Sequence, residues 1–267
     1  HTCAIRNDGN VWCWGSNGSG QLGMGASGGS SPNPVPLDLG SGRTAKALCA
    51  GRQHSCVILD DDTIKCWGYG NNGQLGYGDT TNKNAPPATP VDLGAGRTAK
   101  AVSCGDYHTC AILDDDSLKC WGNNGSGQLG IGDPQYSVNQ ATTPTAVVAT
   151  YLGAGVKSVA AGNRHTCAVL NDGSLKCFGT NNIGQLGTGS YLPPAGNLPA
   201  TADLGTGRTA TDLSLGSYHT CAALDDGTIK CWGYNNEGQV GTGLPGSFGI
   251  TLPTQVSFDG SSSSGSS

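Results

Sequence analysis

The chain has 267 residues, of which 45 are glycine and only 6% are aromatic. Glycine at this level without a collagen-like period indicates many turns. The net charge of −5 at pH 7 and the lack of a Lys/Arg cluster disfavour binding to nucleic acid. No apolar run is long enough to cross a bilayer, and no long segment has the apolar spacing of an amphipathic helix.

One unit recurs five times along the chain. It starts at a histidine, and the five histidines lie 53, 54, 57 and 54 residues apart. Each unit continues through a pair of cysteines and an aromatic-Gly step to Gln-Leu-Gly (Gln-Val-Gly in the last unit), and then to a loop rich in Gly, Pro, Ser and Asn. The units are residues 1–53, 54–107, 108–164, 165–218 and 219–259. Residues 260–267 contain only Gly and Ser and are typical of a flexible tail or linker.

Each unit contains short alternating segments bounded by Gly, Asn and Asp, which is a strand pattern. Units of this length with about four short strands are typical of propeller blades. We therefore predict an all-β fold, a β-propeller of about five four-stranded blades. The sequence is compatible with a closed ring and with an arc of a larger propeller. The stretch "TQVSFDG" near the end is a candidate for completing the first blade.

The cysteine pairs fit a hairpin register, which the fourth unit illustrates. Residues 171–173 form a natural three-residue loop because Gly173 supplies the positive φ that such a loop needs. Leu170 then faces Ser174, and the same register places Cys167 directly opposite Cys177. In two other units Asp62 and Asp116 replace this glycine, and aspartate tolerates that conformation.

Directly opposed residues in a non-hydrogen-bonded antiparallel pair have Cα atoms about 4.5 Å apart, which is at the short end of what a disulfide accepts. We therefore predict one cross-strand disulfide in each unit, worth about 2–3 kcal/mol at most because the closed loop is short. The predicted pairs are Cys3/Cys13, Cys56/Cys66, Cys110/Cys120, Cys167/Cys177 and Cys221/Cys231.

Other uses of these cysteines are weaker. Zinc sites use tighter spacing, and a Cys/His nucleophile would form one site rather than five identical ones. Reduced, buried thiols are the main competing interpretation. Cys49 and Cys104 are left over at non-equivalent positions; they form either a sixth bridge between neighbouring units or small buried residues, and we slightly favour the second. Disulfides persist in oxidising compartments, so an extracellular, cell-surface or periplasmic location is expected.

The stretch "VSCGDYHTCAILDDDSLKCWGNNGSGQLGIGD" resembles the repeat of the regulator of chromosome condensation family, and the resemblance covers about residues 1–259. It implies a β-propeller, usually of seven blades. The family includes an exchange factor for a small GTPase that also binds chromatin, a plant ultraviolet-B photoreceptor and a secreted β-lactamase inhibitor, so the fold does not fix the function. Intracellular members typically have apolar residues in place of the cysteine pair, and its presence suggests a secreted, bacterial-type member.

Two of these family functions fit the residues poorly. The photoreceptor signature is Gly-Trp-Arg-His-Thr, and its tryptophan position is taken here by Arg52, Asp106, Asn163 and Ser217. The basic tail through which the exchange factor binds chromatin has no counterpart in this acidic chain. Disulfides also disfavour a cytosolic or nuclear GTPase partner.

Two features are candidates for binding a protein partner. Gln53, Tyr107, Arg164 and Tyr218 each precede a repeat histidine, in turns that lie on one face of a propeller. Trp12 stands where the other units have lysine, so we expect it to be partly exposed. Tyr, Trp and Arg are enriched in interfaces, although a surface position without any role is the plainer interpretation. The loops after Gln-Leu-Gly differ most between units and are also expected to carry recognition.

The remaining motifs point to structure. We expect each histidine to hydrogen-bond backbone at the start of its strand, in preference to a metal ring or a pH switch. The Trp/Phe series and Gln-Leu-Gly are expected to pack between blades, and Gln-Leu-Gly also to fix a turn. Asp79 and Asp133 could suggest calcium, but no run of alternating oxygen ligands follows them. The histidines are His1, His54, His108, His165 and His219, and the aromatic series is Trp14, Trp67, Trp121, Phe178 and Trp232.

The sequence therefore predicts an extracellular or cell-surface scaffold that binds an unidentified protein or further copies of itself, without enzymatic activity or a cofactor. The Gly-rich "GSNGSGQLG" does not open a helix, which disfavours nucleotide binding. An alternative is a secreted inhibitor of a hydrolase. A further alternative, an exchange factor for a small GTPase, would require reduced cysteines and an intracellular site.

Overall fold

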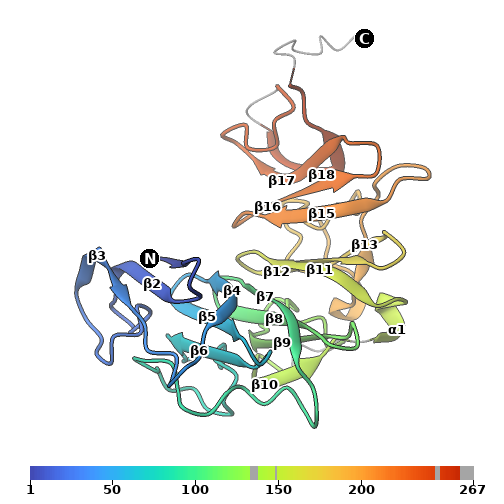
Figure 1. The fold of residues 1–267 in the computed structure, drawn as a ribbon. Helices are drawn as coiled ribbons and strands as arrows, with labels where there is room; N and C mark the ends of the chain where they lie inside the picture. Colours follow the sequence, from blue (N-terminus) through green and yellow to red (C-terminus); the bar gives the residue numbers. More distant parts are fainter. Residues whose placement is uncertain (133–137, 148, 244–246, 259–267) are drawn as a thin grey trace.

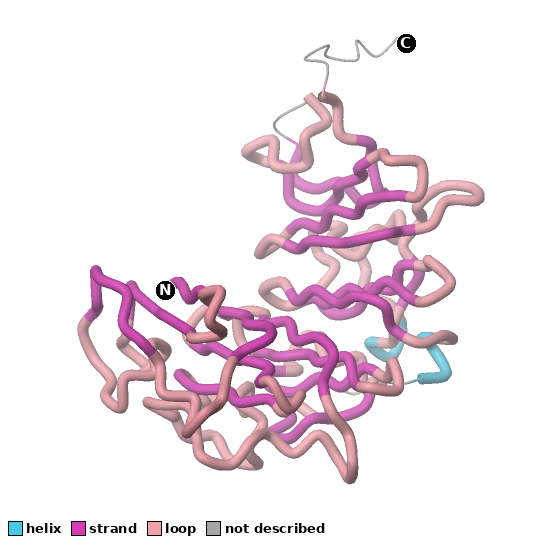
Figure 2. The backbone as a smooth tube through the Cα atoms, in the orientation of Figure 1, coloured by secondary structure: helices cyan, strands magenta, loops and turns pink. Residues whose placement is uncertain are grey.

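The computed structural model describes residues 1–132, 138–147, 149–243 and 247–258. Over these ranges the chain forms five antiparallel sheets that follow one another along a curved array (Figure 1). Strands and connecting loops make up nearly all of it (Figure 2). The predicted all-β propeller fold is confirmed. The tail at 260–267 and Asp133 lie outside the described residues.

The sheets contain three or four strands each. The first has β1 (Thr2–Ile5), β2 (Val11–Ser16) and β3 (Ser30–Pro36), and the second has β4 (Ala45–Ala50), β5 (His54–Leu59) and β6 (Ile64–Gly68). The third has β7 (Ala99–Cys104), β8 (His108–Leu113), β9 (Leu118–Asn123) and β10 (Gln140–Ala146). The fourth has β11 (Val156–Ala161), β12 (His165–Leu170), β13 (Leu175–Gly179) and β14 (Ala200–Thr201). The fifth has β15 (Ala210–Leu215), β16 (His219–Leu224), β17 (Ile229–Asn235) and β18 (Ser247–Gln255). The helix α1 (Ala149–Leu152) and a 3₁₀ turn (Ala195–Asn197) lie in loops.

Each complete sheet takes its first strand from the stretch before its histidine, so the sheets are offset from the sequence units by one strand. The first sheet has no such strand, and in the second an isolated bridge between Gly68 and Lys83 stands in place of a fourth strand. Figure 1 shows the first and last sheets apart, so the described residues form an open arc. Thr254 and Gln255 pair with β17 of the last sheet, which corrects the expectation that "TQVSFDG" completes the first.

The hairpin register is as predicted. Cys167 pairs with Cys177 and Val169 with Leu175, and the N–H of Gly173 donates to the carbonyl of Leu170 at 2.9 Å. Gly173 has φ of +80°, and Asp62 and Asp116 adopt φ of +64° and +63° at the equivalent place. The loop chemistry of each hairpin therefore sets which residues face each other.

Disulfides join all five predicted hairpin pairs, with Cα atoms 4.1 Å apart in each. The competing interpretation expected buried thiols; it is wrong about the bonding, although most of these cysteines are buried. The joined pairs are Cys3–Cys13, Cys56–Cys66, Cys110–Cys120, Cys167–Cys177 and Cys221–Cys231.

Burial of the bridges differs between the inner and the end sheets. Both sulfurs of each bridge are buried in the three inner sheets. In the first and last sheets Cys13 and Cys231 are buried, whereas their partners Cys3 and Cys221 are partly exposed. Cys13 and Cys231 are therefore bridge residues of the core and do not form part of any surface site.

A sixth bridge joins Cys49 of β4 to Cys104 of β7, in different sheets, with Cα atoms 5.5 Å apart. The preference for leaving these two cysteines as free buried residues was therefore wrong. The bridge runs diagonally between the sheets, because Cys49 is the fifth residue of β4 and Cys104 is the sixth residue of β7. The two cysteines therefore occupy different positions of the repeat.

The hydrophobic core lies between neighbouring sheets. The leucine of each Gln-Leu-Gly is buried against the aromatic residue of the following sheet, as with Leu75 and Trp121. A Cβ on Gly76 would lie 2.8 Å from the indole Nε1 of Trp121, so only glycine allows this approach. The amide oxygen of Gln74 accepts the N–H of Asn72 at 3.0 Å and so fixes the turn. The structural role predicted for Gln-Leu-Gly is confirmed, as is that of the aromatic series for Trp67, Trp121, Phe178 and Trp232, whereas Trp14 of the first sheet is only half-buried.

The repeat histidines connect neighbouring sheets rather than capping their own strands. His108 Nε2 lies 2.8 Å from the hydroxyl of Thr166 in the next sheet, and this hydroxyl donates to the carbonyl of Gln128 at 2.8 Å. Because the hydroxyl proton is used in that bond, Nε2–H of the histidine must donate to it. The expected backbone partner is thus corrected to a side chain one unit away. The same arrangement joins His1, Ser55 and Gln21; His54, Thr109 and Gln74; and His165, Thr220 and Gln185.

Replacing Thr166 by valine tests this connection, because the shape is kept while the hydroxyl is lost. Nε2–H of His108 and the carbonyl of Gln128 would lose their partner in a buried site, which costs roughly 1–3 kcal/mol for each group. We expect the free energy of unfolding, measured by guanidinium denaturation with the disulfides intact, to fall by about 2–6 kcal/mol.

Thr2→Val is the matched control. Thr2 occupies the same repeat position, directly after His1, but it is exposed, whereas Thr166 is buried between two sheets. We expect a change within about 0.5 kcal/mol, as for an ordinary surface substitution. Equal losses in the two variants would contradict the role assigned to the hydroxyl.

Candidate functional site

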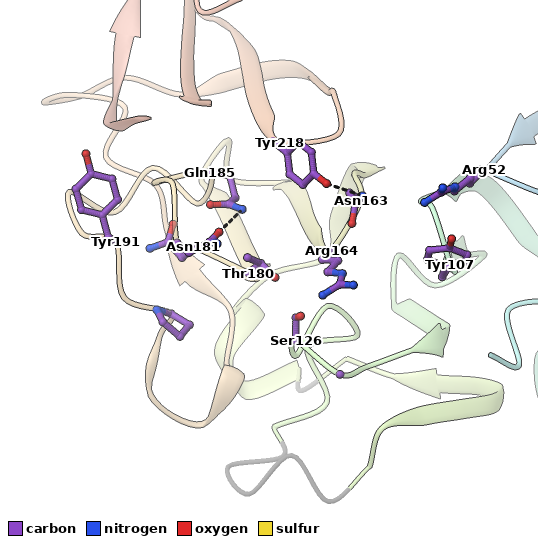
Figure 3. A pocket seen from close by; sticks show the side chains of 13 residues that line it. Arg52, Tyr107, Ser126, Asn163, Arg164, Thr180, Asn181, Gln185, Tyr191 and Tyr218 are labelled. Carbon is purple, nitrogen blue, oxygen red and sulfur yellow. Dashed lines mark hydrogen bonds between the residues drawn. The ribbon is translucent and has the colours of Figure 1, made fainter. Parts of the chain in front are cut away.

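Four turns place their side chains on one face of the array. They connect β4 to β5, β7 to β8, β11 to β12 and β15 to β16, and we call this surface the turn face. A hollow of about 910 Å³ lies on it (Figure 3). Side chains from these turns and from the loops after β9 and β13 line it, among them Arg52, Tyr107, Ser126, Asn163, Arg164, Thr180, Asn181, Gln185, Tyr191 and Tyr218.

A chain of polar contacts crosses the turn face from the second sheet to the fifth. Arg52 Nη1 lies 4.0 Å from Oδ2 of Asp106. The side-chain amide of Asn163 donates to the same Oδ2 at 2.8 Å and lies 3.3 Å from the hydroxyl of Tyr218. Burial raises the pKa of Asp106, and the positive charges of Arg52 and Arg164 oppose this rise. The contacts hold four turns from four sheets in one arrangement.

Aromatic rings support the exposed part of this surface. The Arg52 guanidinium lies 5.5 Å from the centre of the Tyr107 ring, which also meets Tyr69 edge to face at 6.2 Å. Tyr218 contacts Tyr234 in the same way at 6.4 Å and is 46% exposed. These side chains are held in place and still present surface to solvent.

The hollow is positively charged although the chain as a whole is acidic. Arg52 and Arg164 line it, and none of the described residues that line it is acidic. The four other arginines pair with aspartates of the hairpin loops: Arg6, Arg43, Arg97 and Arg208. Arg164 is exposed and forms no ion pair with any residue that the structure describes. In Figure 3 its guanidinium points into the hollow toward Ser126.

The structure brings together three of the five candidate residues. Tyr107, Arg164 and Tyr218 all line the hollow. Gln53 does not; it is half-buried, and its carbonyl accepts the N–H of Tyr69 at 2.8 Å. Trp12 lies apart on β2 of the first sheet. A binding role for any of them stays a prediction.

Trp12 is partly exposed, as expected from its replacement of lysine. It pairs with Pro36 of β3, and the Arg6 guanidinium lies 5.7 Å from the centre of its ring. The equivalent Lys65 instead donates to the carbonyl of Leu39 at 2.9 Å. The tryptophan thus replaces a lysine that bonds to backbone.

Other residues of the turn face and of its hollow were not selected from the sequence. Arg52, Asp106 and Asn163 stand two residues before a repeat histidine, and a polar residue at that place in successive units was a signal that could have found them. Tyr191 is 50% exposed and donates its hydroxyl to the carbonyl of Gly249 at 3.1 Å. It comes from the loop after Gln-Leu-Gly of its unit, one of the variable loops that were expected to carry recognition, but the loop sequences differ between units, so no repeat pattern indicates Tyr191 itself.

The histidines and Asp79 are used within the fold. Burial lowers the pKa of His54, His108 and His165 to about 3, and the neighbouring histidine adds to the effect. The Lys83 ammonium hydrogen-bonds Asp79 and, with Thr81, lowers its pKa to about 2.

Among the described residues, one group of potential metal ligands comes together, Cys49, Cys56 and Cys104, and all three are in disulfides. No helix among the described residues is long and apolar enough to span a membrane.

The buried histidines predict a pH dependence of stability. Their pKa is about 6.5 in an unfolded chain and about 3 in the fold, so below pH 6.5 the unfolded state binds protons that the folded state does not. Stability is full above about pH 6.5 and falls toward pH 3, by up to about 1.4 kcal/mol per pH unit for each histidine.

Denaturation between pH 7.5 and pH 5.0 measures this effect above the range in which most carboxylates titrate. We expect the free energy of unfolding to fall over this window, and to fall by less in His165→Asn, which has one titrating histidine fewer. A free energy of unfolding that stays constant from pH 7.5 to pH 5.0 would show that the buried histidines are not held neutral.

Comparison with known proteins agrees with this architecture. A family model described as the RCC1-like domain matches residues 1–265. The ultraviolet-B receptor UVR8 of Arabidopsis thaliana is 32% identical over 259 residues, which cover 97% of this chain and 56% of that protein. Yeast RCC1 (Prp20), in a structure with Kap60 bound, superimposes with a TM-score of 0.81 at 22% identity over 96% of this chain and 59% of that one. Human WBSCR16 gives a TM-score of 0.80 at 22% identity over 96% and 64%. The chain thus spans between about half and two thirds of these proteins.

Proposed function

Because the chain belongs to the RCC1-like domain family, we propose that it is a non-enzymatic scaffold that binds another protein through the turn face. The observation that carries the proposal is the gathering of Arg52, Tyr107, Arg164 and Tyr218 around one hollow. Tyr and Arg dominate the energetics of many protein interfaces. The yeast relative has been crystallised with a protein, Kap60, bound to it.

The turn face is suited to binding because it is ordered before a partner arrives. The contacts from Arg52 through Asp106 and Asn163 to Tyr218 cross four sheets. A surface whose side chains are already held loses less conformational entropy when a partner binds. The hollow is lined by two arginines and by no acidic side chain from the described part of the chain, which favours a partner that is acidic where it meets the hollow.

The proposed location is extracellular, cell-surface or periplasmic. Six disulfides in a chain of this size support an oxidising compartment, because cytosolic thiols are kept reduced. Inhibition of a secreted hydrolase is a second possibility on the same surface, distinguished by a single target that loses activity when bound. Exchange-factor activity on a small GTPase is less favoured, since it would place these disulfides in a reducing compartment.

Alanine substitution of Tyr107 and Tyr218, which both line the hollow, tests the proposal. The chain, Tyr107→Ala and Tyr218→Ala would each be used to capture proteins from the secreted and the cytosolic fractions of the producing organism. We expect a partner from the secreted fraction, bound at least about tenfold more weakly by each variant, because truncating a central interface tyrosine costs more than about 1.4 kcal/mol.

Tyr151→Ala is the matched control, because Tyr151 is 48% exposed on α1 and does not line the hollow. It should bind as the unsubstituted chain does. A partner whose binding is unchanged in Tyr107→Ala and Tyr218→Ala would place the interface elsewhere. A partner found only in the cytosol would contradict the proposed location, and a GTPase whose nucleotide release is accelerated would support the exchange-factor alternative.

A further inference from the structure

Two disulfides meet where the second and third sheets adjoin. Cys49 on β4 is bonded to Cys104 on β7, and it also lies directly across from Cys56 in the pairing of β4 with β5. Cys56 is bonded to Cys66 in its own hairpin. The Sγ atoms of Cys49, Cys56 and Cys104 all lie within 4.8 Å of one another. A thiolate formed at Cys49 would therefore stand beside a second disulfide.

The two bridges differ in their access to solvent. Cys104 lines a second hollow of about 530 Å³, together with Gly51, Arg52 and Asp106. Cys49 and Cys104 are partly exposed, whereas Cys56 and Cys66 have no exposed surface. An external thiol can thus approach Cys104 from solvent but has no direct path to the buried hairpin bridge.

Other neighbouring sheets of this fold pack together without a disulfide at the position that Cys49 and Cys104 occupy. At the next interface the equivalent positions are Ser103 and Ala161, and the hydroxyl of Ser103 accepts the N–H of Ala161 at 3.0 Å. The interface after that has Ala160 and Leu215 at these positions. Neighbouring sheets therefore pack with a hydrogen bond or apolar side chains at the same place, so opening the Cys49–Cys104 bridge leaves the sheets together.

We propose that the Cys49–Cys104 disulfide is a thiol-exchange site, in which a low-molecular-weight thiol attacks Cys104 and the released Cys49 passes the exchange to the buried Cys56–Cys66 bridge. In the first step the external thiolate bonds to Sγ of Cys104, the Cys49–Cys104 bond breaks, and Cys49 leaves as a thiolate. In the second step Cys49 bonds to Sγ of Cys56, and Cys66 leaves as a thiolate. The number of disulfides is conserved through both steps, so no oxidant is needed.

This exchange links a modification at the surface to a change in the core. Cys104 becomes the site of a mixed disulfide in the hollow beside Arg52, and the hairpin of β5 and β6 loses its own bridge. The inference does not depend on the proposed partner, since it rests on the arrangement of sulfurs alone. The turns that contain Arg52 and Asp106 adjoin the modified site, so the thiol-bound form presents an altered turn face.

Reduced glutathione is the probe, and three hairpin bridges provide an internal comparison. The chain is incubated with glutathione, quenched with acid and N-ethylmaleimide at successive times, and mapped by peptide mass spectrometry. Cys110–Cys120 and Cys167–Cys177 are as fully buried as Cys56–Cys66 but have no neighbouring cysteine thiol. We expect glutathione on Cys104 first, then a Cys49–Cys56 link, with Cys56–Cys66 opening at least about tenfold faster than the other two because the attacking thiol is held nearby.

Two variants make the test decisive. Cys49→Ser/Cys104→Ser removes both surface sulfurs and should slow the opening of Cys56–Cys66 to the rate of the other two bridges. Cys104→Ser alone leaves Cys49 as a thiol and should yield the Cys49–Cys56 link without glutathione. Equal opening rates for the three bridges in the unsubstituted chain would overturn the proposal, as would a faster Cys56–Cys66 that persists in the double variant. Should Cys104→Ser fail to fold, the rates in the unsubstituted chain and the double variant still decide.

Discussion

The arrangement of the sheets depends on one hydroxyl at each interface. The Thr or Ser that follows a repeat histidine reaches back to the preceding sheet, where it accepts a hydrogen bond from that sheet's histidine and donates one to the carbonyl of that sheet's glutamine. All three groups are buried in the interior interfaces, so leaving any one of them unpaired would be costly. The bond pair fixes the distance and the orientation between neighbours. It also places each turn before a histidine at a regular position, and this regularity produces the turn face.

At its two ends the array lacks this connection. Thr2 is exposed and Trp14 only half-buried, whereas the equivalent residues of the inner sheets are fully buried. His219 has no hydroxyl partner from a following sheet among the described residues, and its ring is partly exposed. Burial still lowers the pKa of His219, although no large shift arises there. The interior interfaces and the ends thus share one sequence pattern and differ only in whether a neighbour is present.

The sequence was sufficient for features that are set within one unit. The three-residue loop at residues 171–173 determines the register, and the register determines that Cys167 faces Cys177. Contacts between units were harder to predict. The partner of each histidine lies more than fifty residues away, as with His108 and Thr166, and nothing near the histidine indicates a hydroxyl rather than backbone. The Cys49–Cys104 bridge joins non-equivalent positions and was missed for the same reason.

The residues of the candidate site also divide into those that the repeat pattern identified and those that only the three-dimensional structure reveals. Tyr107, Arg164 and Tyr218 were identifiable because a repeat places them at one position of successive turns. Gln53 shares that position, but the hollow is lined by Arg52 beside it, and the repeat pattern does not indicate which of two adjacent turn residues faces the hollow. Tyr191 reaches the hollow from a loop whose sequence differs between units, so only the three-dimensional arrangement identifies it. Trp12 belongs to another surface altogether.

The account as a whole rests on oxidised cysteines, because the bridges hold the hairpins, supply the exchange site and support an oxidising compartment. The most direct measurement is the intact mass of the protein from its producing organism after alkylation under denaturing conditions, with and without prior reduction. The account predicts that none of the twelve cysteines reacts before reduction and that all twelve react afterwards. Alkylation of all twelve without reduction would contradict it, since the paired cysteines would then be core thiols and the extracellular location would lose its support.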